Sequence, residues 1–329
     1  MSTSSPSTLL GAPVALLSIG QMMPSVEEAL ARRFTVHSSN TQALEALLAE
    51  HAGSVRAIAT RGRESVDAAL IARLPNLELI ASFAVGYDSI DLCAARERGI
   101  IVTNTPDVLT DEVADFTVGL TLATLRQIPQ SDNHVRSGAW SSGAFRLTPS
   151  LRDRTIGIAG MGRIGQAIAA RFLPFGRPIA YHSRRSVAGL PYAYHPDLLG
   201  LARAVDILIV ILPGGTATRH AIDARVLEAL GPDGLLINVA RGSVVDEDAL
   251  VDALRAGTIL GAGLDVFASE PAFTPELANF STVVLTPHVG SATHHTRSLM
   301  AALGERNLVA WFAGEGPVTP VPETPWSSS

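Results

Sequence analysis

The sequence predicts an α/β protein with two doubly wound, parallel-sheet domains. Three observations support this fold class. The chain has 329 residues, more than one ordinary hydrophobic core holds, which suits two domains. Short apolar runs with β-branched residues alternate with helical patterns, as in parallel strands joined by crossover helices. A glycine-rich turn also joins one such run to a helical pattern over residues 154–171.

The first half of the chain reads as a complete sheet. Strands are expected at residues 14–19, 35–37, 55–59, 79–83 and 100–103, with helices at 41–50, 67–74 and 92–98 and another that opens at Pro24. Ligands bind such sheets outside the carboxyl ends of the strands, so loops 60–63 and 84–88 form the expected ligand side. Residues 1–8 are Ser- and Thr-rich and are expected to be a disordered tail. The apolar stretch 9–19 is too short to span a bilayer and lacks a preceding positive charge.

The second half is longer and more regular. A long apolar helix is expected over residues 108–126, and residues 136–149 are expected to form a polar loop with turn-forming residues. After the strand before the glycine turn, strands are expected at 178–181, 207–212, 235–239, 259–264 and 283–286. The final helix, 291–312, is long enough to return to the first domain, and residues from Pro317 onward are expected to be a tail. The predicted domains are therefore 1–107 plus 296–329, and 108–295.

The glycine turn predicts a dinucleotide-binding site. Gly160-Met-Gly162-Arg-Ile-Gly165 follows a buried strand and opens a helix, which is the context that a G-x-G-x-x-G pattern needs. Gly160 can form the turn, Gly162 lets the backbone approach a pyrophosphate, and Gly165 allows the helix to pack closely on the strand. The amides at the helix N-terminus then face the phosphates. A glycine turn without a ligand is the alternative, which the flanking strand and helix disfavour.

The end of the next strand predicts which dinucleotide binds. An NAD site usually carries Asp or Glu there to bind the ribose 2′-hydroxyl. Residues 182–186, His-Ser-Arg-Arg-Ser, contain no acid. Ser183 can donate a hydrogen bond, and Arg184 and Arg185 can bind a phosphate. We therefore expect NADP(H) to be preferred, with NAD(H) as the alternative. The alternative interpretation of Arg184 and Arg185 is that they are solvated surface residues that bind no ligand.

Composition narrows the class of protein. With 47% hydrophobic and 17% charged residues, the chain is globular rather than disordered. A net charge of −6 and the absence of a basic run disfavour nucleic acid and membrane partners, and a cytoplasmic enzyme is expected. A single cysteine, Cys93, excludes an intrachain disulfide framework, and no metal site is expected. The chain contains no lysine, which excludes Schiff-base catalysis by a lysine side chain.

Three candidate catalytic residues follow predicted strands of the second half. These residues are Arg241, Glu270 and His288. Strand ends of a doubly wound sheet share one edge, so the three side chains could converge beside the nicotinamide. A carboxylate fixes the tautomer of a paired histidine and favours its protonated form, and an arginine binds a carboxylate at two points. This set suits reduction of a 2-oxo acid. Taken alone, however, Arg241 could form a surface ion pair, Glu270 could be a turn carboxylate and His288 could be a core histidine.

Five longer segments carry a family resemblance. They are residues 238–246, 263–271, 286–293, 85–88 and 103–106. Together they resemble the D-isomer-specific 2-hydroxyacid dehydrogenases, over about residues 14–321. Within that family the chain is most similar to NADPH-dependent glyoxylate/hydroxypyruvate reductases, and hydroxyphenylpyruvate reductases are almost as similar. The resemblance implies a Rossmann cofactor domain, a flavodoxin-like substrate domain and an active site in the cleft.

The resemblance implies a role for each matching residue. Arg241 would bind the carboxylate and carbonyl of a small 2-oxo acid, His288 would protonate the carbonyl oxygen, and Glu270 would pair with His288. The implied substrate-binding residues are Arg61, Gly62, Val85, Gly86, Trp140, Arg241 and His288. With the glycine turn and the basic pair, the expected cofactor-binding residues are Thr110, Gly160, Met161, Gly162, Arg163, Ile164, Gly165, Ser183, Arg184, Arg185, Leu212, Pro213, Thr218, Val239, Ala240, Arg241, Asp265, His288 and Gly290, with Asp265 near the nicotinamide amide.

Some alternatives remain open. A homodimer is implied in which Trp140 reaches the partner's active site, but an ordinary core or interface tryptophan explains it equally well. Residues 213–216, Pro-Gly-Gly-Thr, depart from the family's usual segment. Hydroxyphenylpyruvate or 2-ketogluconate reduction is an alternative activity, and a nucleotide-sensing corepressor is an alternative of another class. A formate-dehydrogenase-like activity is disfavoured, because that subgroup carries glutamine where this chain has Glu270.

Overall fold

The computed structural model describes residues 13–327 and divides into two compact units. The first unit comprises residues up to Leu109 and from His294 onward, and the second runs from Thr110 to Thr293. The boundaries expected from the sequence, 107 and 296, lie two residues from these limits. The predicted tail at residues 1–8 lies outside the described residues.

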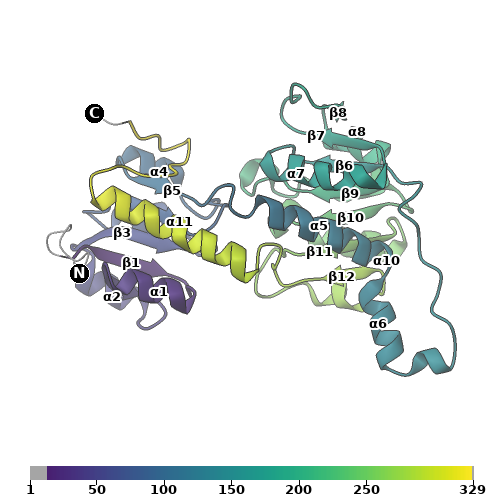
Figure 1. Ribbon diagram of the computed structural model, residues 1–329, viewed down its shortest axis with the longest axis horizontal. Coiled ribbons are helices and arrows are strands. Elements are labelled where there is room, and N and C mark those ends of the chain that lie inside the picture. Colours follow the sequence, from purple (N-terminus) through teal and green to yellow (C-terminus); the bar gives the residue numbers. More distant parts are fainter. Residues whose placement is uncertain (1–12, 328–329) are drawn as a thin grey trace, which may run out of the picture. The chain divides into compact units, whose positions relative to one another are not determined.

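The first unit is a five-stranded parallel sheet in the order β2-β1-β3-β4-β5 (Figure 1). Its strands are β1 (Ala15–Ile19), β2 (Thr35–Ser38), β3 (Val55–Thr60), β4 (Leu79–Ser82) and β5 (Ile101–Thr103), and its helices are α1 (Pro24–Ala31), α2 (Leu44–His51), α3 (Ala68–Ala72), α4 (Leu92–Glu97) and α11 (His294–Phe312). Leu16 and Leu17 are both fully buried, in separate cores on opposite faces of the sheet. Both faces are covered, which explains the continuous apolar strands.

The residues after α11 do not form a tail in the described part of the chain. Val321 is 1% exposed, and its N–H donates to the carbonyl of Val102 in β5 at 2.9 Å. The N–H of Val102 in turn donates to Oγ1 of Thr324 at 2.9 Å. The prediction of a tail from Pro317 onward was therefore wrong, because this polar-looking segment satisfies the backbone of the edge strand.

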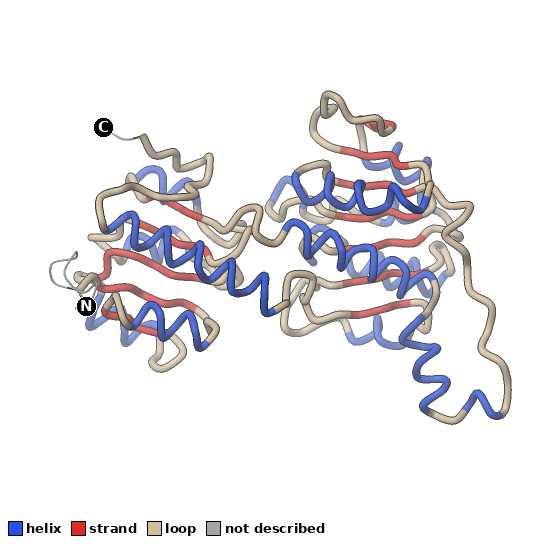
Figure 2. Tube along the Cα trace, viewed as in Figure 1, coloured by secondary structure: helices blue, strands red, loops and turns tan. Residues whose placement is uncertain are grey.

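The second unit is a seven-stranded parallel sheet in the order β12-β11-β10-β9-β6-β7-β8, with helices on both faces (Figure 2). Its strands are β6 (Ile156–Ala159), β7 (Ile179–His182), β8 (Ala193–His195), β9 (Ile207–Val210), β10 (Leu235–Asn238), β11 (Gly261–Leu264) and β12 (Val283–Leu285). Its helices are α5 (Thr110–Leu125), α6 (Ile128–Arg136), α7 (Arg163–Phe172), α8 (Leu198–Ala204), α9 (Ala224–Leu230) and α10 (Glu247–Ala256). The predicted fold class, with two doubly wound parallel sheets, is confirmed.

Two elements of the second unit were not predicted. Helix α6 contains no buried residue, and Ile128 and Val135 are its only large apolar side chains, which is too few to mark a helix in a sequence. Strand β8 is an edge strand of three residues with no fully buried position. Both elements depend on neighbouring structure rather than on a local pattern.

The parallel strands of the second unit determine where its site lies. Since every pair of neighbouring strands in this sheet is parallel, all seven carboxyl ends lie along one edge. Along that edge the sheet presents, in spatial order, the segments that follow β12, β11, β10, β9, β6 and β7. Among the described residues, no helix is long and apolar enough to cross a membrane.

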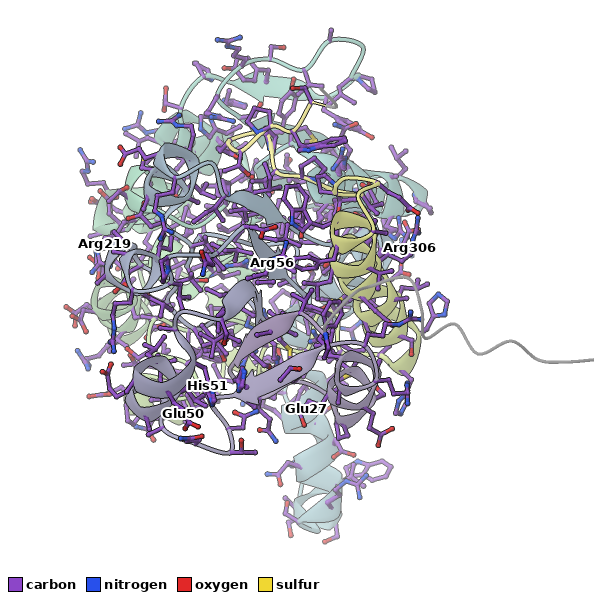
Figure 3. All side chains as sticks on the ribbon, turned by 90° about the vertical axis from the view of Figure 1, so that its left-hand side faces the viewer. Glu27, Glu50, His51, Arg56, Arg219 and Arg306 are labelled. Carbon is purple, nitrogen blue, oxygen red and sulfur yellow. The ribbon has the colours of Figure 1, made fainter. Side chains whose placement is uncertain are left out.

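The first unit contains a stacked histidine pair that predicts a pH effect on stability. The rings of His37 in β2 and His51 in α2 lie 3.8 Å apart at 21°, and Figure 3 shows His51 beside Glu50. Burial and the neighbouring His51 lower the pKa of His37 below 6.5, although Glu50 acts in the opposite direction. The unfolded chain therefore binds this proton more readily, so the thermal midpoint should fall as pH drops below about 6.5.

His37→Gln should reduce this loss of stability, as measured by melting curves between pH 5 and pH 7.5. His295→Gln serves as the control, because His295 is an exposed histidine of the same unit. An unchanged pH dependence in His37→Gln would contradict the assignment.

Candidate active site

The glycine turn joins β6 to α7. Gly160 has φ +109°, and a Cβ there would lie 2.6 Å from the carbonyl oxygen of Ile211. A Cβ at Gly165 would lie 2.1 Å from the carbonyl oxygen of Gly160. Gly162 differs, since a Cβ there meets no described atom within 4 Å. The fold therefore requires the first and third glycines, whereas the second leaves the backbone open for a ligand.

The turn fits a dinucleotide pyrophosphate. The ten-residue helix α7 starts at Arg163, with Gly162 as its extended N-cap residue. Its first backbone N–H groups lack helical partners and carry a partial positive charge, which suits phosphate oxygens. Gly162, Arg163 and the amides of the first turn are therefore the residues that would hold the pyrophosphate.

The loop after β7 carries the basic pair. Arg184 and Arg185 are both exposed. The loop backbone is held by the hydroxyl of the buried Tyr181, which accepts the N–H of Val187 at 2.9 Å, and by Ser183, whose Oγ donates to the carbonyl of Arg185 at 2.6 Å. A positively charged, ordered loop suits a phosphate on the adenosine ribose.

Glu270 and His288 form a close pair. His288 Nδ1 lies 2.8 Å from Glu270 Oε2, and the side chains are 28% and 18% exposed, respectively. The other carboxylate oxygen accepts the N–H of Phe267 at 3.2 Å. His288 follows β12 with φ +55°, and Glu270 follows β11, the neighbouring strand. The contact fixes the orientation of the imidazole and leaves Nε2 as the nitrogen that can transfer a proton.

Asp265 holds the loop that carries His288. Its carboxylate accepts three hydrogen bonds, from Thr286 Oγ1 at 2.7 Å, the N–H of Val289 at 2.9 Å and the N–H of Gly290 at 2.8 Å. Burial raises the pKa of Asp265, while these three donors act in the opposite direction. Asp265 therefore positions the backbone on both sides of His288.

Arg241 is the third residue of the segment after β10. Its carbonyl accepts the side-chain amide of Asn238 at 3.0 Å, and its Nη1 donates to the carbonyl of Ala240 at 2.7 Å. The next residue, Gly242, is packed so tightly that a Cβ would lie 1.8 Å from the backbone carbon of Phe267. The segments after β10 and β11 are thus in direct contact.

A family comparison supports the chemistry that this edge suggests. Residues 118–290 match the model of the D-isomer specific 2-hydroxyacid dehydrogenase, NAD binding domain. This match covers more than half of the chain. The chain belongs to the D-isomer-specific 2-hydroxyacid dehydrogenase family. It is therefore an oxidoreductase with a domain for a nicotinamide dinucleotide, and the resemblance inferred from the sequence is confirmed.

Relatives of this dehydrogenase extend over nearly its whole length. It is 46% identical to glyoxylate/hydroxypyruvate reductase A of Arabidopsis thaliana, over 94% of this chain and 99% of that protein. It is also 46% identical to the hydroxyphenylpyruvate reductase of Plectranthus scutellarioides, with the same coverage. A crystal structure of an NADPH-dependent glyoxylate/hydroxypyruvate reductase from Sinorhizobium meliloti, in complex with NADP and malonate, has 48% identity and a TM-score of 0.90, and the match covers 97% of this chain and 99% of that one.

The dehydrogenase's predicted site residues divide between the two units. In the second unit, Thr110 begins α5. The other predicted residues of this unit lie in or near the segments after β6, β7, β9, β10, β11 and β12; they are Gly160–Gly165, Ser183–Arg185, Leu212, Pro213, Thr218, Val239–Arg241, Asp265, Glu270, His288 and Gly290. Thr218 Oγ1 donates to the carbonyl of Pro213 at 2.6 Å, which orders the segment that departs from the family pattern. Trp140 lies beyond α6 and is 65% exposed, so it is not a core residue of this chain.

The first unit orders the other predicted substrate loops. Gly62 has φ +75°, and a Cβ there would lie 2.7 Å from the carbonyl oxygen of Gly86. The side-chain amide of Asn104 donates to the carbonyl of Val85 at 2.8 Å, and Arg61 Nη1 donates to the carbonyl of Gln21 at 2.7 Å. The loops after β3 and β4 thus pack against each other.

Sequence reasoning missed Glu247, which contacts the Glu270 loop, and its partner Thr274 within that loop. Glu247 accepts hydrogen bonds from Ala268 and Thr274. In the sequence it is an ordinary acidic residue in the first turn of a helix, and no local pattern distinguishes it. Only the fold shows that its carboxylate reaches a loop 21 to 27 residues further along the chain.

The turn geometry predicts different outcomes for two glycine substitutions. Gly162→Ala should leave the thermal midpoint nearly unchanged, because its Cβ meets no described protein atom, but should weaken NADPH binding at least tenfold by obstructing the pyrophosphate. Gly165→Ala should also destabilise the protein, by about 1–3 kcal/mol, because its Cβ clashes with the backbone of Gly160.

Calorimetry and fluorescence titration with NADPH would check both effects. Unchanged NADPH affinity in a well-folded Gly162→Ala protein would contradict the placement of the pyrophosphate.

Proposed function

We propose that this dehydrogenase uses NADPH to reduce a small 2-oxo acid of the glyoxylate or hydroxypyruvate type to the D-2-hydroxy acid. The Glu270–His288 pair is the observation that carries the proposal, because it provides an oriented proton donor on the sheet edge that also bears the glycine turn. The names of relatives at 46% to 48% identity support the substrate class.

Each residue of the site has a distinct task in this reaction. The planar guanidinium of Arg241 binds the substrate carboxylate and orients the carbonyl. When bound, the cofactor supplies a hydride to the 2-carbon. Protonated His288 donates a proton from Nε2 to the carbonyl oxygen, while Glu270 holds the opposite nitrogen and stabilises the positive charge of the imidazolium.

The preference for NADPH follows from the loop after β7. Arg184 and Arg185 provide two positive charges, and no carboxylate in residues 182–187 repels a 2′-phosphate. The S. meliloti enzyme is described as NADPH-dependent and was crystallised with NADP, which supports the same preference here.

The remaining assignments concern other parts of the chain. The backbone amides of Val85 and Gly86, together with Arg61 and Gly62, contact the substrate, as the family resemblance implies.

The chain forms a homodimer through the segment that includes α6, where Ile128, Val135, Trp140 and Leu147 are 51%, 54%, 65% and 98% exposed. The enzyme acts in the cytoplasm.

Hydroxyphenylpyruvate is the alternative substrate. The P. scutellarioides relative named for that activity is as similar to this chain as the Arabidopsis enzyme. Reduction of glyoxylate, hydroxypyruvate and hydroxyphenylpyruvate, measured by NADPH oxidation, would separate the two substrate classes. A kcat/KM that is highest for hydroxyphenylpyruvate would contradict the proposed substrate.

Removing the catalytic groups should greatly lower kcat/KM for the oxo acid without abolishing cofactor binding. His288→Ala should lower kcat by about 10²–10⁴-fold, because it removes the proton donor. Arg241→Ala should mainly raise KM for the oxo acid, because it removes the carboxylate partner. Kinetics on purified variants, with NADPH titration as the control, would test both. Near-normal kcat/KM in either variant would contradict these roles.

Removing the basic pair should change the choice of cofactor. In Arg184→Ala/Arg185→Ala, KM for NADPH should rise about 10–100-fold, while KM for NADH changes little, because only NADPH carries the phosphate. The comparison is the ratio of kcat/KM with the two cofactors in wild type and variant. A wild-type preference for NADH, or equal losses with both cofactors, would contradict the assignment.

A further inference from the structure

The loop that presents Glu270 is long and largely exposed. It leaves β11 through Asp265, and Ala268, Ser269 and Phe273 are exposed along it. Such a loop has few buried contacts of its own, so its position depends on the bonds that close it. The proposed function requires it to hold a carboxylate within hydrogen-bonding distance of His288.

One carboxylate, that of Glu247, receives hydrogen bonds from both sides of Glu270. Glu247 Oε1 accepts the N–H of Ala268 at 2.7 Å, and Oε2 accepts the hydroxyl of Thr274 at 2.5 Å. Glu270 therefore belongs to a seven-residue segment, 268–274, both of whose ends are held by the same side chain. Charge-assisted bonds of this kind are stronger than neutral ones.

We call Glu247 and its two hydrogen bonds to Ala268 and Thr274 the Glu247 bracket; its base lies at the capped start of a helix. Glu247 is the first residue of α10, whose N-cap Asp246 accepts the N–H of Ala249 at 3.2 Å. Glu247 thereby connects the capped start of a helix to the exposed loop that carries Glu270. The rings of Phe267 and Phe273, 5.7 Å apart, close the same loop beside the bracket.

We propose that Glu247 is a positioning residue for the reaction and acts through Glu270. By holding both ends of segment 268–274, it keeps the Glu270 carboxylate at His288 Nδ1 and so keeps the imidazole aimed at the substrate. This inference rests on the proposed function of the Glu270–His288 pair. Residues that orient a catalytic group in this way affect turnover rather than ground-state binding.

The test compares variants of the bracket. Glu247→Ala removes both acceptors and should lower kcat about tenfold, while KM for glyoxylate and the Kd for NADPH stay within about twofold. Glu247→Gln is the conservative variant: its amide can accept from Ala268 and donate to the Thr274 hydroxyl, so it should retain most of the activity. Thr274→Val removes one end only and should give a smaller loss, which provides a second test if Glu247→Ala folds poorly.

The matched control is Asp248→Ala. Asp248 lies in the same first turn of α10 and is exposed, so its removal changes the helix charge equally without touching the loop. It should leave kcat unchanged. A loss equal to that of Glu247→Ala would indicate a general effect on the helix and would overturn the proposal.

A double-mutant cycle identifies the route of the effect. If Glu247 acts through Glu270, then Glu247→Ala/Glu270→Gln should be no slower than Glu270→Gln alone. A loss of activity in the double variant equal to the product of the two single losses would overturn the proposal. Full activity of Glu247→Ala beside an impaired Glu270→Gln would also overturn it. Either result would leave the proposed function intact. Full activity of Glu270→Gln itself would contradict the proposed function, and the positioning role with it.

Discussion

The carboxylate of Asp265 is the constraint on which the candidate active site depends. It is 2% exposed and accepts hydrogen bonds from Thr286, Val289 and Gly290. These bonds tie the segment after β12 to the end of β11, and Glu270 follows only five residues later. A buried carboxylate with three donors is costly to disturb, because any donor left unpaired would lose its bond in a dry environment. His288 and Glu270 thus meet because their loops share this anchor.

The parallel sheet provides the second level of organisation. Parallel strands bring the carboxyl ends of β6, β9, β10, β11 and β12 to one edge, and these ends carry the glycine turn, Arg241, Glu270 and His288. Residues separated by up to 128 positions in the chain, such as Gly160 and His288, lie along this one edge. The chemistry of the protein is therefore a consequence of strand order, and the loops contribute the specific groups.

Most of this arrangement could be predicted from residue patterns. The strand, glycine turn and helix at 154–171 are local, and each of Arg241, Glu270 and His288 follows a recognisable strand. Features that depend on distant partners could not be predicted. Helix α6 buries no residue, β8 is a three-residue edge strand, and the pairing of Val321 with β5 has no local signal. The bracket formed by Glu247 was missed for the same reason, since its partners lie 21 and 27 residues away.

In the proposed reaction, Arg241 and the Glu270–His288 pair act on one small 2-oxo acid beside a dinucleotide on the glycine turn. A crystal structure of the protein with NADP and malonate, a dicarboxylate that cannot be reduced, tests it most directly. We expect a malonate carboxylate on the guanidinium of Arg241, His288 Nε2 within hydrogen-bonding distance of a malonate oxygen, and the pyrophosphate at Gly162. Malonate bound elsewhere, or an imidazole turned away from it and from Glu270, would contradict the proposed reaction.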